Sequence, residues 1–161
     1  MLLEWIHILN SIILLGTAVG GAFFLFMANR SREPGSIYFS ARNVVRMNWM
    51  FTLPTGVIQP ATGMMMMHER DYSFTEGWLV LAVMLYLFAA VCWVMGALQQ
   101  SKMRDMAQVA FSSREELPPR FRQMHRNWEW LAVIAFLSLA GISYLMVVKP
   151  QIAFLSGLVA H

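Results

Sequence analysis

The positively charged residues of this chain are confined to two stretches that separate long apolar runs. Ten of the twelve lysines and arginines lie within residues 30–46 and 102–126 of a chain of 161 residues. A water-soluble domain distributes basic residues over its whole surface, whereas a multi-pass membrane protein gathers them in its cytoplasmic loops. The pattern therefore predicts that both basic stretches face the cytoplasm and that both termini lie outside.

The apolar content predicts that most of the chain is embedded in lipid. Hydrophobic residues make up 58% of the sequence and charged residues 13%. A helix needs roughly 20 apolar residues to cross the hydrocarbon core, so the chain accommodates four spans. We expect an all-α, four-transmembrane-helix bundle with N-out/C-out orientation, folded as a single domain over residues 1–161 in the bacterial inner (cytoplasmic) membrane. The expected spans are 3–28, 47–67, 78–98 and 128–148, and the expected cytoplasmic loops are 29–46 and 99–127.

Two segments of this layout carry further expectations. Residues 36–46 alternate apolar and basic side chains, which favours a short interfacial helix or an extension of the second span. Pro54 and Pro60 each remove a backbone donor and should bend the second span.

Charge and cysteine content exclude several classes of function. The net charge of +3 is explained by the two cytoplasmic stretches and by contact with anionic lipid, so we expect no nucleic-acid partner. Cys92 is the only cysteine, which rules out an internal disulfide and a multi-cysteine metal cluster. We expect the lipid bilayer as the main partner, with a homo-oligomer or a larger membrane complex as further alternatives.

Polar residues in the first predicted span mark a candidate site. Glu4, His7 and Ser11 recur at spacings of three and four residues, which places them on one helical face. An ionisable group near the bilayer centre costs about 2.5–3.5 kcal/mol or more, so a histidine within a span is a functional candidate. Because His7 lies close to the outer boundary, the alternative is a structural histidine that bonds to Glu4 and interfacial water.

A second polar stripe follows the prolines of the second predicted span. Threonine and glutamine at such positions often only join helices or cover carbonyls that proline leaves free. We favour that structural role for the threonines and leave the role of the glutamine open. The stripe consists of Thr52, Thr55, Gln59 and Thr62.

The depth of His7 suggests a site for a flat cofactor. At about 1.5 Å of rise per residue, His7 lies level with Gly63 on the second predicted span and with Tyr144 on the fourth. Small residues beside a histidine suit a porphyrin, whose iron is commonly bound by histidine. The hypothesis is a haem b pocket in which His7 is the axial ligand, Glu4 orients the imidazole, and Gly63 and Tyr144 complete the site.

A methionine run at the outer end of the second span suggests a different metal. Met64, Met67 and His68 share one helical face, and thioether and imidazole ligands suit Cu(I). Methionine is also a common gap-filler in apolar packing, and we favour that role because the outer loop offers no further soft ligands. A copper-handling or transport protein is therefore an alternative function.

The sequence identifies no reaction. It contains no visible nucleophile and base set, no phosphate-binding glycine loop and no paired carboxylates within one span. Whether the protein is an enzyme is left open. A non-catalytic accessory subunit, in which the polar stripes only join helices, is the third alternative.

Short motifs spread over nearly the whole chain carry a family resemblance. They are Trp5-Ile6-His7, Phe51-Thr52-Leu53-Pro54, Gln59-Pro60-Ala61-Thr62-Gly63, Gly77-Trp78, Met103-Arg104-Asp105 and Leu117-Pro118-Pro119-Arg120. This set resembles a bacterial family of predicted integral membrane proteins, domain-of-unknown-function family 2269. The resemblance implies a membrane-embedded fold and brings no activity with it.

The same layout is more distantly similar to the HemJ-type protoporphyrinogen oxidase, a small helical membrane bundle that binds haem b. The matching features are the tryptophan and histidine of the first span, the Thr-x-Pro of the second, the Gly-Trp before the third and a basic loop before the last. The resemblance implies that His7 is functionally important and that haem is bound. A lysine expected early in the third helix has no counterpart in residues 79–82, so the resemblance implies a haem pocket more than the oxidase reaction.

Overall fold

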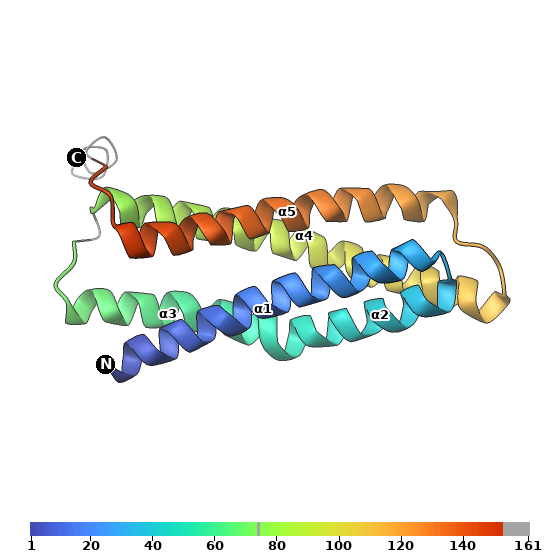
Figure 1. The fold of residues 1–161 in the computed structure, drawn as a ribbon, viewed down its shortest axis with the longest axis horizontal. Coiled ribbons are helices and arrows are strands. Elements are labelled where there is room, and N and C mark those ends of the chain that lie inside the picture. Colours follow the sequence, from blue (N-terminus) through green and yellow to red (C-terminus); the bar gives the residue numbers. More distant parts are fainter. Residues whose placement is uncertain (74, 153–161) are drawn as a thin grey trace.

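The computed structural model describes residues 1–73 and 75–152, which form a bundle of long helices. The helices run along one axis, and the N-terminus lies at the same end of the bundle as the last turn of α5 (Figure 1). We call this end the N-terminal end and the opposite one the basic end. The elements in chain order are α1 (Leu2–Ser31), α2 (Pro34–Met47), a π-helical turn (Asn48–Thr52), α3 (Leu53–Glu69), α4 (Gly77–Ser113) and α5 (Pro119–Val148).

The surface of the bundle is apolar in the way that a lipid-facing surface is. Among the described residues, three helices are long and apolar enough to cross a membrane, namely α1, α4 and α5. Large side chains on them lie at the surface: Leu87 is 61% exposed and Leu137 is 61% exposed. Water-soluble monomers rarely expose contiguous apolar surface on this scale, so the surface is that of a membrane protein.

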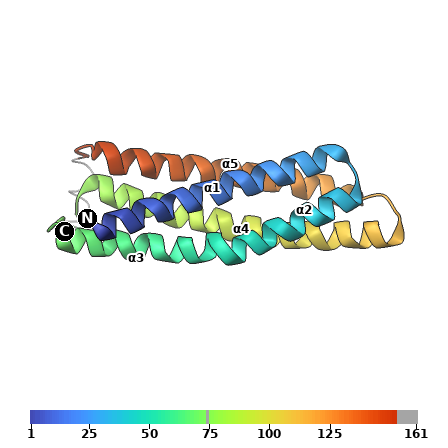
Figure 2. The same cartoon turned by 60° about the horizontal axis from the view of Figure 1, so that its bottom comes forward.

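The second predicted span, residues 47–67, lies in the π-helical turn and α3, which continue α2 without a break (Figure 2). α3 alone has 17 residues and contains Pro60, and it is not among the three long apolar helices. The π-helical turn joins it to α2, and the backbone N–H of Leu53 bonds to the carbonyl of Asn48, five residues earlier. The turn ends two residues before Pro54, which has no N–H to continue the α-helical pattern. The extra residue in this turn changes which side chains of the helix face the interior.

The two stretches expected as cytoplasmic loops, 29–46 and 99–127, are mostly helical rather than irregular. α2 occupies most of the first, α4 continues to Ser113, and α5 begins at Pro119. The expectation of a helix over residues 36–46 is confirmed. Packing explains the difference, since the apolar faces of these extensions meet in a buried cluster that stabilises helix beyond the hydrophobic spans. Its members are Leu25, Ala28, Ile37, Ala41, Met103, Ala107, Phe121 and Trp128.

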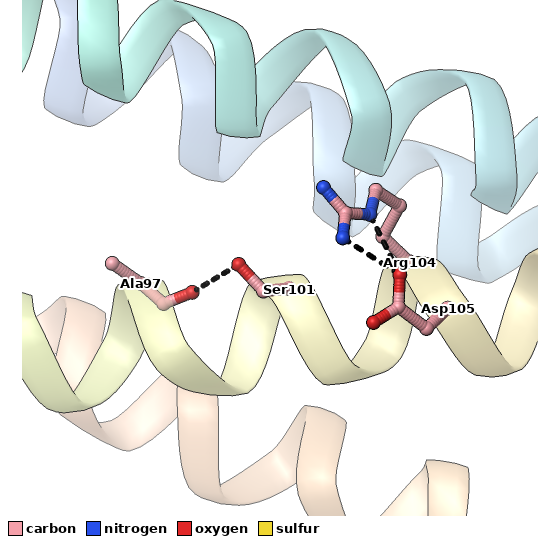
Figure 3. A network of polar contacts seen from close by, with 4 residues as sticks. All are labelled: Ala97, Ser101, Arg104 and Asp105. Atoms are coloured by element: carbon pink, nitrogen blue, oxygen red, sulfur yellow. Dashed lines mark hydrogen bonds and ion pairs between the residues drawn. The ribbon is translucent and has the colours of Figure 1, made fainter.

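Polar side chains of α4 beside this cluster form hydrogen bonds within their own helix (Figure 3). Nε and Nη2 of Arg104 donate to Oδ1 of Asp105 over 2.9 and 2.7 Å. The hydroxyl of Ser101 donates to the carbonyl of Ala97 over 3.1 Å. Partly exposed pairs of this kind contribute about 0–1 kcal/mol, so the association of helices at the basic end comes from the apolar cluster.

A second apolar cluster closes the bundle at the N-terminal end. It joins the end of α3, the start of α4 and the end of α5, and beside it Nζ of Lys149 donates to the hydroxyl of Tyr72 over 2.9 Å. The bundle is thus tied together at both ends, and the site lies between the two clusters. The buried members of the second cluster are Met67, Trp78, Leu79, Ala82 and Leu145.

Candidate functional site

A continuous row of hydrogen-bonded side chains joins α1 to the helix formed by the π-helical turn and α3. We call this row the polar seam. Its bonded partners are distant in the sequence: Thr17 and Thr52 are 35 residues apart, and His7 and Thr62 are 55 residues apart. Its members are His7, Asn10, Ser11, Thr17, Thr52, Thr55, Gln59 and Thr62.

Both ring nitrogens of His7 are engaged in the polar seam. Nδ1 lies 2.7 Å from Oγ1 of Thr62, and Nε2 lies 2.9 Å from Nε2 of Gln59. The Gln59 amide donates, so Nε2 of His7 must accept. The Thr62 hydroxyl donates to the carbonyls of Ile58 and Gln59, so Nδ1 of His7 supplies the proton of its own bond. The partners therefore define a neutral imidazole with its proton on Nδ1.

Gln59 is the hub of the seam. Its Oε1 accepts a hydrogen bond of 2.6 Å from Nδ2 of Asn10, and its Nε2 donates to Oγ of Ser11 over 2.6 Å as well as to His7. Asn10 also donates to the carbonyl of Thr55 over 2.8 Å. The donors and acceptors of this set are mutually consistent, and a satisfied polar network gains strength in a low-dielectric interior. The hub thus fixes how α1 and α3 are rotated against each other.

The seam continues towards α4 through the π-helical turn. Oγ1 of Thr52 lies 3.2 Å from Oγ1 of Thr17 and 3.3 Å from Oδ1 of Asn48. Nδ2 of Asn48 donates to Oε1 of Gln100 over 2.5 Å. Polar groups therefore extend from the imidazole near the N-terminal end to the middle of α4.

In the structure Glu4 and His7 have different partners. The carboxylate of Glu4 forms an ion pair with the guanidinium of Arg70, while the imidazole is held by Gln59 and Thr62. Arg70 lies at the end of α3, close enough to reach α1 and compete for the carboxylate. The sequence placed Glu4 and His7 on one helical face, but it could not show that Arg70 would form an ion pair with Glu4.

Gly63 lies beside His7 in the structure, as the sequence predicted. A Cβ atom at Gly63 would lie 3.5 Å from Cε1 of His7, so the glycine faces the imidazole directly. Tyr144 is 62% exposed on α5, and none of the hydrogen bonds of His7 in the described residues reaches it. Its place in a haem site stays a prediction.

The three residues of the copper hypothesis have different surroundings. Met67 is 7% exposed and packs in the apolar cluster at the N-terminal end, whereas Met64 is 57% exposed and His68 is exposed as well. The part of the chain that the structure describes holds no group of three or more histidine, cysteine, aspartate or glutamate side chains that could bind a metal ion. The surroundings of Met67 support the packing role that we favoured for it.

A cavity of about 880 Å³ lies between the polar seam and the α4–α5 pair. Small residues such as Gly56, Ala89 and Gly96 leave this space open, and most of the wall is apolar. The exposed side chains of Val57 and Phe136 are part of the wall, so the cavity opens sideways onto the apolar surface. His7 is not part of this wall, because its ring is turned into the seam.

One part of the cavity wall is polar and lies towards the basic end. Asn48, Gln100 and Glu129 line the cavity there. Oε1 of Glu129 lies 3.3 Å from Nδ1 of His125, a side chain that is 2% exposed. This wall places two amides and a carboxylate next to a mostly apolar space.

Sequence reasoning missed several of these polar residues. Asn10 lies three residues after His7 in an apolar run, and that spacing alone was a signal that it shares the histidine's face. Asn48 and Gln100 carried no comparable signal, because each lies in a stretch that was expected to be a boundary or a loop. Their role depends on the π-helical turn and on the continuation of α4.

Comparison with known proteins adds a family to this geometry. A family model described as a predicted integral membrane protein (DUF2269) matches residues 1–150. No curated protein and no solved structure matches the chain. The family match covers all five helices, the polar seam and the cavity. The chain therefore belongs to the DUF2269 family of predicted integral membrane proteins.

Proposed function

We propose that this protein binds a lipid-soluble ligand inside its helical bundle and takes it up from the surrounding membrane. The observation that carries the proposal is the sideways-open cavity between the two apolar clusters. Its volume of about 880 Å³ falls within the range of roughly 300–1,000 Å³ that is common for small-molecule sites. An apolar wall with a few polar groups at one side is also typical of such sites.

The route of entry follows from where the wall meets the surface. Val57 is 63% exposed, Phe23 is 59% exposed and Phe136 is 42% exposed, and all three line the cavity. These side chains face the region that lipid chains occupy in a membrane protein. A ligand that dissolves in the bilayer therefore reaches the cavity without crossing water.

We further propose that the bundle spans the bacterial cytoplasmic membrane four times, with both termini outside. The continuous helix of α2, the π-helical turn and α3 supplies the additional span beside α1, α4 and α5. The basic residues of both stretches lie at one end of the bundle, which supports a cytoplasmic position for that end under the positive-inside rule. The protein acts either alone, as a homo-oligomer or within a larger membrane complex.

The ligand can be tested by isolating the protein in mild detergent and analysing it by native mass spectrometry. We expect one bound lipid-soluble compound per chain. Ala135→Phe fills the cavity from α5 and should release the compound, whereas Ala140→Phe is exposed on the same helix and should not. A parent protein that carries no compound and copurifies with a larger complex would instead support the accessory-subunit role.

A second candidate is a haem-handling or redox role with haem b bound through His7. The tautomer supports it, because an axial histidine uses the lone pair of one nitrogen while the other nitrogen donates to an oxygen acceptor, here Thr62. Gly63 supports it as well, since a glycine leaves room beside the ring. Haem would supply one-electron transfer at this position. Ligation requires the Gln59 amide to leave Nε2, the atom that it now occupies.

An absorption spectrum of the purified protein, oxidised and reduced, tests the haem candidate. We expect a Soret band that is lost in His7→Ala and retained in Glu4→Gln, because Glu4 pairs with Arg70 and not with the imidazole. A protein that shows no Soret band even after haem is added would rule this candidate out. That result would leave the cavity proposal intact, since His7 is not part of the cavity wall.

A further inference from the structure

We infer that the ligand of the cavity is a prenylated quinone or quinol, whose ring lies against the polar wall formed by Asn48, Gln100 and Glu129. This inference rests on the proposed ligand-binding function. It concerns the chemistry of the headgroup, which the size of the cavity alone does not define.

Gln100 supplies a buried hydrogen-bond donor for the ligand. The residue is 7% exposed and lines the cavity. Its Oε1 accepts from Asn48 over 2.5 Å, but its Nε2 makes no hydrogen bond among the described residues. Because Gln100 lines the cavity, this amide nitrogen is available to donate to a carbonyl or hydroxyl oxygen on a ligand.

Glu129 favours a headgroup that is neutral and can donate a hydrogen bond. Its carboxylate lies in the same wall and can accept a hydrogen bond from a hydroxyl. A phosphate or carboxylate headgroup would be disfavoured at this position, since it would bring a like charge towards the carboxylate of Glu129. A neutral ring with oxygen substituents suits this wall, because a quinone carbonyl accepts from Gln100, and a quinol hydroxyl both accepts from Gln100 and donates to Glu129.

The neighbouring wall suits a flat ring. Gly96 is one helical turn from Gln100, and a Cβ atom there would lie 3.6 Å from Cδ1 of Trp128. The indole edge of Trp128 therefore packs close to the backbone of Gly96, and both residues line the cavity. Aromatic side chains form favourable offset or edge contacts with another ring, and Trp93 and Trp128 both line this part of the space.

The apolar part of the cavity suits an isoprenoid tail. Phe136 lies two helical turns, or about 10 Å, along α5 from Glu129, and it marks the side opening. A ring at the polar wall therefore leaves a tail that runs through the apolar space and out into the bilayer. A phospholipid would fit the tail region but would bring its phosphate towards Glu129, and a second copy of this chain would bring no oxygen-bearing ring to the wall.

The inference can be tested by ligand binding to the full-length protein in nanodiscs. The probe is a quinone with a short isoprenoid tail, whose binding is followed by quenching of tryptophan fluorescence, and the comparison ligand is the isoprenoid hydrocarbon without a ring. Bound hydrocarbon is measured by mass spectrometry because it does not quench. We expect the quinone to bind about two- to thirteenfold more tightly, as one hydrogen bond of about 0.5–1.5 kcal/mol from Gln100 would give.

Two variants examine the polar wall itself. Gln100→Glu keeps the oxygen that accepts from Asn48 but removes the amide donor, and it should weaken quinone binding about two- to thirteenfold. Gln100→Leu should weaken it to a similar extent. Gln108→Leu, which is exposed on the same helix, is the matched control and should bind as the parent does. Thermal unfolding of each variant checks that the bundle is intact.

The outcomes separate the two proposals. Equal binding of the hydrocarbon and the quinone, or full quinone binding by Gln100→Glu, would overturn the headgroup assignment and leave the cavity function standing. Binding of neither compound, together with an empty parent protein in mass spectrometry, would overturn both. Copurified phospholipid that the quinone does not displace would also contradict the inference.

Discussion

The side-chain amide of Gln59 donates to Nε2 of His7 over 2.9 Å and so joins α3 to α1. The same amide donates to Ser11, and the carbonyl oxygen of Gln59 accepts from Asn10. One side chain thereby satisfies polar groups on three residues of a mostly apolar helix. The relationship explains how the polar groups of a partly buried histidine are satisfied within this helix pair.

Replacing the hub should loosen the α1–α3 contact. Gln59→Leu leaves Nε2 of His7 and Oγ of Ser11 without this partner, and each unsatisfied buried group costs about 1–3 kcal/mol. Because hydrogen bonds between membrane helices are measured at about 0.6 kcal/mol on average, we expect a total loss of about 1–3 kcal/mol. Unfolding by steric trapping in bicelles measures it. Gln108→Leu is the control, and equal stability of the two variants would contradict the hub role.

The size of the residue at position 63 should control the orientation of His7. A Cβ atom there would make an ordinary contact with Cε1 of His7 at 3.5 Å, so Gly63→Ala should be tolerated. Gly63→Leu should push the imidazole away from Gln59 and cost about 1–3 kcal/mol by overpacking. Nitrogen-15 NMR of the labelled imidazole reports the change. Gly16→Leu, whose surroundings are open, should leave the spectrum unaltered.

The packing of the helical extensions at the basic end should contribute to the free energy of unfolding. Met103 is fully buried at 0% exposure, so Met103→Ala should lower the free energy of unfolding by about 2–5 kcal/mol. Met95 lies on the same helix and is 48% exposed, and Met95→Ala should have little effect. Parallel unfolding curves of the two variants give the difference. If the Met103 variant unfolded like the Met95 variant, the apolar cluster would not stabilise this end.

The orientation of the bundle can be measured by labelling single cysteines. In a Cys92→Ala background, Ser73→Cys lies in the connection between α3 and α4 and Ser112→Cys lies at the end of α4, and both positions are exposed. A membrane-impermeant maleimide should label the first in intact spheroplasts and the second only after permeabilisation. The reverse pattern would show that both basic stretches face outward.

The connection between α3 and α4 should contain a tyrosine with a lowered pKa. A hydrogen bond from Lys149, together with the charge of that lysine, lowers the pKa of Tyr72 below its ordinary value of 10.0. A lowered pKa stabilises the folded state only where the phenolate forms, so the contribution is present above the ordinary pKa and is lost as the pH falls through the lowered value. Stability at neutral pH should therefore not depend on this ionisation.

Ultraviolet titration of the tyrosinate band measures this pKa, with Tyr72→Phe identifying the signal. Lys149→Met removes both the donor and the charge and should move the titration of Tyr72 upward. An unchanged midpoint in that variant would contradict the role of Lys149.

Several features could be read from the chain because they depend on local pattern. Long apolar runs predicted an all-helical membrane protein, and the clustered arginines predicted that both basic stretches share one end. The level of His7 with Gly63 followed from the constant rise of a helix. The helical character of residues 36–46 followed from the alternation of apolar and basic side chains. These predictions need only the spacing of residues within one helix.

Other features came only from the way the helices pack. Spacing placed Glu4 on the face of His7, but the rotation of α3 against α1 decided that Gln59 and Thr62 hold the imidazole. The π-helical turn before Pro54 changed which residues face inward and brought Asn48 to Gln100. The cavity could not be predicted from hydropathy. An apolar side chain has the same hydropathy whether it faces lipid or lines a cavity.

Amino-acid order by itself therefore determined that this protein is helical, that its basic residues gather in two stretches and that His7 lies level with Gly63. Tertiary structure alone decided which groups the histidine contacts and where the bundle remains hollow. The physical reason is that rise and periodicity belong to a single helix, whereas rotation and separation between helices come from side chains distant in sequence that meet only after folding.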